Sequence, residues 1–87
     1  MAQTLEAPAL VEEMVGDEPY QYYPLGEFVV SAPKVCKGRP TFKYTRVEVA
    51  DVLKFIGAGH PVEELAEGYQ GKISKEAIQE AIELAAE

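Results

Sequence analysis

The sequence predicts a mainly α fold, in which a short β-hairpin or strand segment precedes a bundle of three short helices. Apolar residues recur at helical spacing in three runs within residues 48–87, separated by turns that contain glycine. Aromatic and β-branched residues punctuated by proline and glycine favour strands in residues 19–47. A chain of 87 residues forms one domain. We divide it into an acidic arm (1–18), an extended segment with a basic loop (19–47) and a tri-helical bundle (48–87).

The N-terminal arm contains five acidic residues and no basic one. Its apolar residues have helical spacing, which predicts a short amphipathic helix over about residues 8–15; the alternative is a frayed tail. Such a helix is too short to be stable alone in water. We therefore expect the arm to bind a protein partner, another subunit of its own dimer, or the tyrosines of its own chain. The candidate partner-binding residues are Leu10, Val11, Glu12, Glu13, Met14 and Val15.

The extended segment predicts a two-stranded hairpin. We expect residues 27–31 to pair with residues 41–47, joined by a loop through residues 34–38. A two-stranded ribbon is only marginally stable, so it should pack on the helices or pair with another subunit. We expect a homodimer that uses this segment.

Three helices are expected in the bundle. The first covers about residues 48–56, with Thr45 and Glu48 at the spacing of a capping box. The second begins at Pro61, since proline is favoured in the first turn of a helix. The third has Ser74 as its N-cap. Three such helices with tight turns form an arrangement that includes the helix-turn-helix.

Basic residues gather in the middle of the chain. The net charge is −7, yet residues 21–50 carry five basic residues against two acidic ones. Only this part has the sign for phosphate contacts, because the overall charge opposes attraction to nucleic acid. A second interpretation has Arg39 and Arg46 pair with helix carboxylates and hold the hairpin to the bundle. In a third, the acidic ends bind a basic cleft of a partner.

Nothing in the sequence predicts catalysis. The single histidine, His60, lies at a helix start, and Cys36 has no histidine close in sequence to activate it. Phosphate-loop glycines and metal-ligand clusters are absent from the sequence. We expect a protein that is not an enzyme and has no cofactor or metal. With unpaired cysteine and no run of about 20 apolar residues, we also expect a soluble, cytoplasmic protein without membrane contact.

A series of motifs occurs in a specific order within residues 30–86. They are Gly38-Arg39-Pro40, Thr45-Arg46-Val47 followed by Val49, Ala58-Gly59, Glu63-Glu64-Leu65, Tyr69, and Ile73-Ser74-Lys75-Glu76 ahead of Ile78. In these motifs the chain resembles the domain of unknown function family 433, a family of small, antitoxin-like prokaryotic proteins. It departs from the family pattern at Tyr44, where the family usually has glycine. This tyrosine argues against a positive-φ turn before Thr45.

The resemblance implies a homeodomain-like helix-turn-helix preceded by a strand, often in a dimer. It also implies an antitoxin that binds a PIN-like ribonuclease toxin and its own promoter DNA. The basic loop would then contact phosphates, while the start of the last helix reads bases. The alternative is a dimeric protein-interaction module of unknown function that does not bind DNA. The candidate DNA-binding residues are Lys34, Lys37, Arg39, Lys43, Arg46, Ser74, Lys75 and Gln79.

Overall fold

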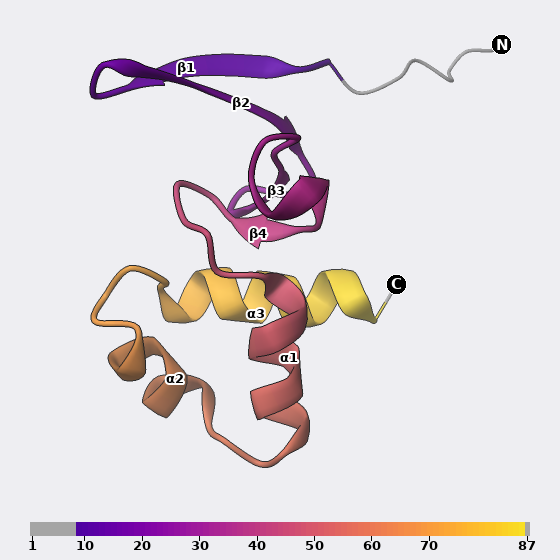
Figure 1. Ribbon diagram of the computed structural model, residues 1–87. Helices are drawn as coiled ribbons and strands as arrows, with labels where there is room; N and C mark the ends of the chain where they lie inside the picture. Colours follow the sequence, from indigo (N-terminus) through magenta and orange to yellow (C-terminus); the bar gives the residue numbers. More distant parts are fainter. Residues whose placement is uncertain (1–8, 87) are drawn as a thin grey trace, which may run out of the picture.

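The computed structural model describes residues 9–86, in which four strands precede three helices (Figure 1). The strands are β1 (Val11–Val15), β2 (Glu18–Pro24), β3 (Val29–Ser31) and β4 (Thr41–Phe42), with a short 3₁₀ helix, η1 (Cys36–Gly38), between the last two. The helices are α1 (Val49–Gly57), α2 (Val62–Gly68) and α3 (Lys75–Ala85). The three expected helices are therefore present, with bounds close to those predicted.

The four strands form one antiparallel sheet in the order β1-β2-β3-β4. The fold is thus α+β, and the prediction of a mainly α fold is wrong. The expected hairpin of residues 27–31 with residues 41–47 is confirmed in a shorter form, in which Val29 pairs with Phe42 and Val30 with Thr41. The prediction missed a second hairpin, which precedes this one and doubles the number of strands.

The second hairpin contains β1 and β2, and it overturns the predicted N-terminal helix. Val15 pairs with Glu18, so that only Gly16 and Asp17 form the turn. Gly16 has a φ of +63°, which glycine adopts without steric cost at the first position of a two-residue hairpin turn. Pairing with β2 supplies backbone partners that stabilise β1, whereas a helix of this length is marginal in water. The first residue of the predicted helix, at position 8, lies outside the described residues.

The main hydrophobic core lies between the helices and the strands β3 and β4. All three helices contribute to it, and the N-terminal hairpin lies on the far side of β3 and β4 from them (Figure 1). Its buried residues are Val29, Phe42, Val49, Val52, Leu65, Ile73, Ala77, Ile78 and Ala81. A smaller cluster, formed by Tyr22, Val30 and Ala32, packs under the hairpin.

One side chain of α3 joins the helices to the sheet. Both carboxylate oxygens of Glu80 accept hydrogen bonds from successive backbone amides of the loop between β2 and β3. The donors are the N–H groups of Glu27 (2.8 Å), Phe28 (2.7 Å) and Val29 (3.1 Å). A Cβ atom at Gly26 would lie 2.6 Å from a Glu80 oxygen, so a larger residue at this position would displace the carboxylate.

The turn between β4 and α1 differs from the prediction in two respects. Thr45 does not form a capping box with Glu48: its hydroxyl donates to the Phe42 carbonyl at 2.7 Å and accepts from the amide of Val47 at 3.1 Å. Tyr44 has a φ of +67°, so the expectation that tyrosine excludes a positive-φ turn is also wrong. By contrast, Ser74 caps α3 as predicted, accepting from an amide in the first turn.

Candidate functional site

The basic stretch splits into residues whose charges are paired and residues whose charges are exposed. Arg39 belongs to the first group, because its Nε lies 2.8 Å and its Nη2 3.1 Å from the two carboxylate oxygens of Glu48. This hydrogen bonding raises the pKa of Arg39 and lowers the pKa of Glu48. Glu48 is the N-cap residue of α1. Arg39 therefore ties the loop before β4 to the start of the helices, as the second interpretation of the basic stretch proposed for it.

Lys43 also has partners within the chain. Its Nζ lies 5.0 Å from the ring centre of Tyr22, 5.2 Å from that of Tyr44 and 4.0 Å from a carboxylate oxygen of Glu13. The pKa of Lys43 is raised, and the largest cause is hydrogen bonding with the Tyr22 side chain. Two aromatic faces and one carboxylate stabilise an ammonium ion better than any of them alone. This arrangement holds Lys43 in place and leaves its charge little available for DNA.

Glu13 is at the centre of the same group. Its two oxygens accept hydrogen bonds of 2.6 Å from the hydroxyls of Tyr22 and Tyr44. These bonds, first that of Tyr22, hold the pKa of Glu13 below its ordinary value of 4.5. The Tyr20 hydroxyl accepts from the Tyr44 amide at 2.9 Å. We call these four residues, with Lys43, the tyrosine cluster; it fastens the N-terminal hairpin to the turn before α1.

Arg39 is exposed although it is paired, and three further cations of the basic stretch are exposed: Lys34, Lys37 and Arg46. Within residues 9–86, none of these three forms an ion pair within 4.0 Å. Lys34 and Arg46 line a shallow cleft of about 330 Å³ beside the β1–β2 turn, which also contains the acidic Glu18. The interpretation of Arg46 as a partner of helix carboxylates therefore finds no support in the described ion pairs.

The predicted base-reading residues lie elsewhere, at the start of α3. Ser74, Lys75 and Gln79 are exposed. Lys75 and Gln79 line a hollow between α2 and α3 together with Glu63 and Glu76. The structure thus places Lys75 among carboxylates, and Lys75 and Gln79 line a different hollow from Lys34 and Arg46.

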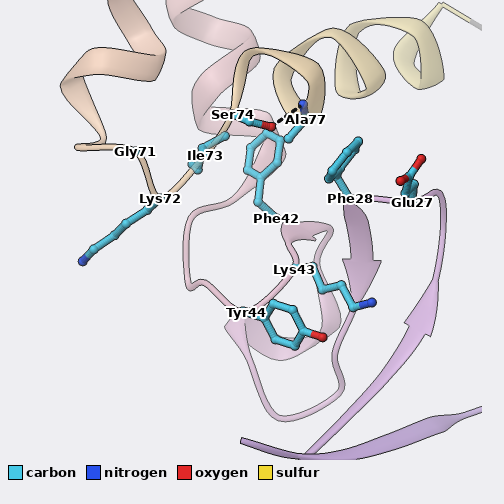
Figure 2. Close-up of a pocket in the computed structure, with 10 residues that line it drawn as sticks. All are labelled: Glu27, Phe28, Phe42, Lys43, Tyr44, Gly71, Lys72, Ile73, Ser74 and Ala77. Atoms are coloured by element: carbon cyan, nitrogen blue, oxygen red, sulfur yellow. Dashed lines mark hydrogen bonds between the residues drawn. The ribbon is translucent and has the colours of Figure 1, made fainter.

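A cleft of about 420 Å³ connects the tyrosine cluster with the start of α3. Figure 2 shows the ring of Phe42 beside Ile73 and Ala77, Phe28 beside Glu27, and Lys43 and Lys72 extending in different directions. Its full lining is Glu27, Phe28, Phe42, Lys43, Tyr44, Gly71, Lys72, Ile73, Ser74 and Ala77. Sequence reasoning missed Tyr44 and Lys72 as surface residues of this region. The departure from the family pattern at position 44 was the one signal for Tyr44.

The candidate partner-binding residues lie in and just before β1. Leu10 (44%), Met14 (64%) and Val15 (47%) are large apolar side chains with much of their surface exposed. Glu12 accepts a hydrogen bond of 2.7 Å from the amide of Gln21 on the neighbouring strand. The single apolar face expected of a helix is therefore absent, because Met14 and Val15 are consecutive residues of β1 and point to opposite faces of the sheet.

The described residues form neither a metal-binding cluster nor a membrane-spanning helix. In the part of the chain that the structure describes, no three of the histidine, cysteine and acidic side chains are grouped to hold a metal ion. His60 lies 2.9 Å from Glu64, one turn away on α2. None of the helices formed by residues 9–86 has the length and apolar character needed to cross a membrane.

Comparison with known proteins gives one match. Searches of curated proteins and of solved structures each find nothing similar to this chain. The family described as "Protein of unknown function (DUF433)" matches residues 29–85, which include β3, β4 and all three helices. The N-terminal hairpin precedes the matched region. Because the match covers more than half of the chain, the protein belongs to the DUF433 family.

Proposed function

We propose that this protein is an antitoxin-like DNA-binding protein that acts as a homodimer and binds both a PIN-like ribonuclease toxin and its own promoter DNA. The observation that carries the proposal is the arrangement of α2 and α3. A short turn, residues 69–74, joins them, and α3 begins with a capped, exposed first turn that carries Lys75. A DNA-reading helix of a helix-turn-helix uses its N-terminal residues in this way. The chain belongs to the DUF433 family, whose description assigns no function. The antitoxin part of the proposal comes from the resemblance of the sequence motifs to antitoxin-like proteins.

In this proposal we divide the roles by whether a charge is paired or exposed. Lys34, Lys37 and Arg46 are exposed cations and contact phosphates. Ser74, Lys75 and Gln79 face the bases. Arg39 and Lys43 are positioning residues, because their charges are paired with Glu48 and Glu13. The hairpin strand β1, with its exposed apolar residues and its carboxylates, faces the toxin.

DNA binding is tested with fragments of the upstream region of the protein's own gene, titrated at several salt concentrations. We expect the Lys34→Ala/Lys37→Ala double variant to lose affinity for all sequences and to reduce the salt slope by about two. Changes at Lys75 or Gln79 should instead alter the preference among sequences. Lys54→Ala is the matched control, since Lys54 is an exposed lysine of α1 outside both surfaces. Absence of binding at low salt, with and without a co-purified partner, would contradict the proposal.

A second candidate function is a dimeric protein-interaction module that does not bind DNA. This second function is favoured by the ion pairs that Arg39 forms with Glu48 and Lys43 with Glu13. These pairs leave fewer of the eight basic residues to contact DNA in a chain of net charge −7. Purification from the source cell, followed by mass spectrometry of the proteins that accompany the chain, separates the two candidates. A ribonuclease in the complex together with promoter binding supports the first, and a different protein without DNA binding supports the second.

A further inference from the structure

The outer edge of β1 has free hydrogen-bonding groups in a defined register. β1 is the first strand of the sheet, and within residues 9–86 it pairs only with β2. Residues that flank a two-residue hairpin turn exchange backbone hydrogen bonds, and this pattern alternates along the strands. Val11, Glu13 and Val15 therefore bond to β2. The backbone N–H and C=O groups of Glu12 and Met14 point outward.

Within residues 9–86, no further strand pairs with this edge and no bulge interrupts it. Exposed edge strands are commonly covered by a helix or loop, interrupted by a bulge or blocked by proline, because they pair readily with other chains. The hairpin lies away from the helices (Figure 1), and the pairing of β1 with β2 is continuous over five residues. Met14 and Leu10, beside the free backbone groups, are exposed apolar side chains.

The acidic charge around this edge favours a basic partner strand over a second copy of the chain. Residues 9–19 contain four acidic residues and no basic one. Glu12 and Glu13 lie at the centre of β1, so symmetric antiparallel pairing of two copies brings carboxylates directly opposite each other, which is destabilising. The carboxylate of Glu13 already accepts hydrogen bonds from Tyr22 and Tyr44, whereas the side chain of Glu12 is exposed. A strand that carries lysine or arginine complements this edge, and a second copy of β1 does not.

We infer that the outer edge of β1 is the docking site for an extended, basic segment of a protein partner, which adds to the sheet as a fifth strand. Backbone hydrogen bonds to Glu12 and Met14 supply affinity. A basic side chain of the segment pairs with Glu12, and an apolar one packs on Met14. The inference rests on the partner-binding part of the proposed function and adds the mode of binding.

The test uses the full chain and, as the probe, a capped eight-residue peptide with the repeat Lys-Lys-Val-Val. In a strand this repeat places lysine and valine next to each other on the same face, as Glu12 and Met14 require. Binding is followed by nuclear magnetic resonance. Amide signals of residues 10–15 should shift on titration. Two further peptides carry methyl groups on the backbone nitrogens of every second residue, one at the odd positions (one frame) and one at the even positions (the other frame). Only the frame that faces β1 should weaken binding, by about tenfold or more, since it removes the backbone donors. Equal effects of both frames would overturn the inference.

A variant of the protein provides an independent check. Met14→Pro removes an outward N–H that β2 does not use, so the hairpin should remain paired. It should lower peptide affinity by about tenfold, whereas Met14→Thr, which keeps the N–H, should lower it only a few-fold. Unchanged affinity in Met14→Pro, with the hairpin signals intact, would overturn the inference. So would self-association of the wild type that Met14→Pro abolishes, because the occupant would then be a second copy.

The outcomes for the inference and for the proposed function are separable. If the peptide binds in one frame but no ribonuclease or promoter binding is found, the edge site stands and the antitoxin proposal fails. If a co-purified ribonuclease binds Met14→Pro and the wild type equally, the edge site fails and the proposed function stands.

Discussion

The helical half of the molecule and its N-terminal hairpin are stabilised by different interactions. The helices and the strands β3 and β4 enclose a continuous apolar core, in which Val52 and Ile78 are completely buried. The hairpin has a small core around Tyr22 and is held mainly by hydroxyl, carboxylate and ammonium groups. Hydrophobic burial depends little on pH and salt, whereas the contacts of the tyrosine cluster depend on both.

Because their stabilising interactions differ, the stabilities of the two halves can be measured separately. The helical half coincides with most of the region that matches the family, and the hairpin precedes it. We expect the helical half to determine the global stability and the hairpin to open locally at lower free energy. The following predictions are ordered by the size of the expected effect.

The largest effect is expected from the core of the helical half. Ile78→Ala removes a side chain with no exposed surface and should lower the free energy of unfolding by about 2–5 kcal/mol. Chemical denaturation followed by circular dichroism measures the change. Ile82→Ala is the matched control on the same helix, where the side chain is only partly buried, and its cost should be smaller. Equal costs at both positions would contradict the assignment of the core.

The connection between the halves should be the next most sensitive. Glu80→Ala leaves three backbone amides without their acceptor and should cost about 1–3 kcal/mol. Gly26→Ala should also destabilise, because its Cβ would displace the same carboxylate. A double-mutant cycle measures the coupling: Gly26→Ala should cost much less in the Glu80→Ala background. Additive effects would show that the loop does not depend on Glu80.

A buried hydroxyl at the boundary of the two halves offers a stabilising change. Thr41 has no exposed surface, and among the described residues its Oγ1 has no hydrogen-bond partner. Thr41→Val replaces this group with a methyl of similar size and should raise the free energy of unfolding by about 1 kcal/mol. The midpoint of urea denaturation tests it. A lower midpoint would mean that the hydroxyl is satisfied in solution.

The smallest effect on global stability should come from the tyrosine cluster. Tyr44→Phe removes one hydroxyl donor to Glu13 and should accelerate amide exchange in β1 a few-fold, while α3 is unaffected. Tyr69→Phe, a change at a half-buried tyrosine outside the cluster, is the control. Faster exchange in α3 as well as in β1 would contradict the local opening of the hairpin.

The same cluster should respond to pH with a defined sign. The folded state lowers the pKa of Glu13 from 4.5, so it favours the ionised carboxylate. The stabilisation is therefore present above about pH 4.5 and is lost as the pH falls through the lower folded pKa. Hairpin amides should exchange with less protection at about pH 3 than at about pH 6, after correction for the intrinsic rates. Glu13→Gln should remove most of this dependence.

The helical half was largely predictable from sequence, and the hairpin was not. The periodicity of α1 and α3 and the cap at Ser74 are local signals, and the structure confirms them. In β1, apolar residues at positions 10, 11, 14 and 15 have helical spacing, and this period was preferred over strand alternation. The stronger signal was the two-residue turn at Gly16 and Asp17 between segments of similar length.

The candidate site shows the same contrast between local and distant signals. Exposure of Lys75 and Gln79 follows from their place on the amphipathic helix α3. The pairing of Lys43 with Glu13 depends instead on a hairpin that brings together residues 30 positions apart, and no local pattern encodes it. Arg39 and Glu48 are closer in sequence, but their contact depends on how the chain turns between η1 and α1.

The bond between Glu80 and the β2–β3 loop also affects the order in which the chain can fold. The bonded residues are 51–53 positions apart, and the loop leaves the ribosome before α3 does. Until α3 has formed, the amides of Glu27, Phe28 and Val29 lack this acceptor. Contacts between distant residues slow folding because a long loop must first be closed. The joint between β2 and β3 therefore reaches its final geometry only after synthesis of the helix that supplies the carboxylate.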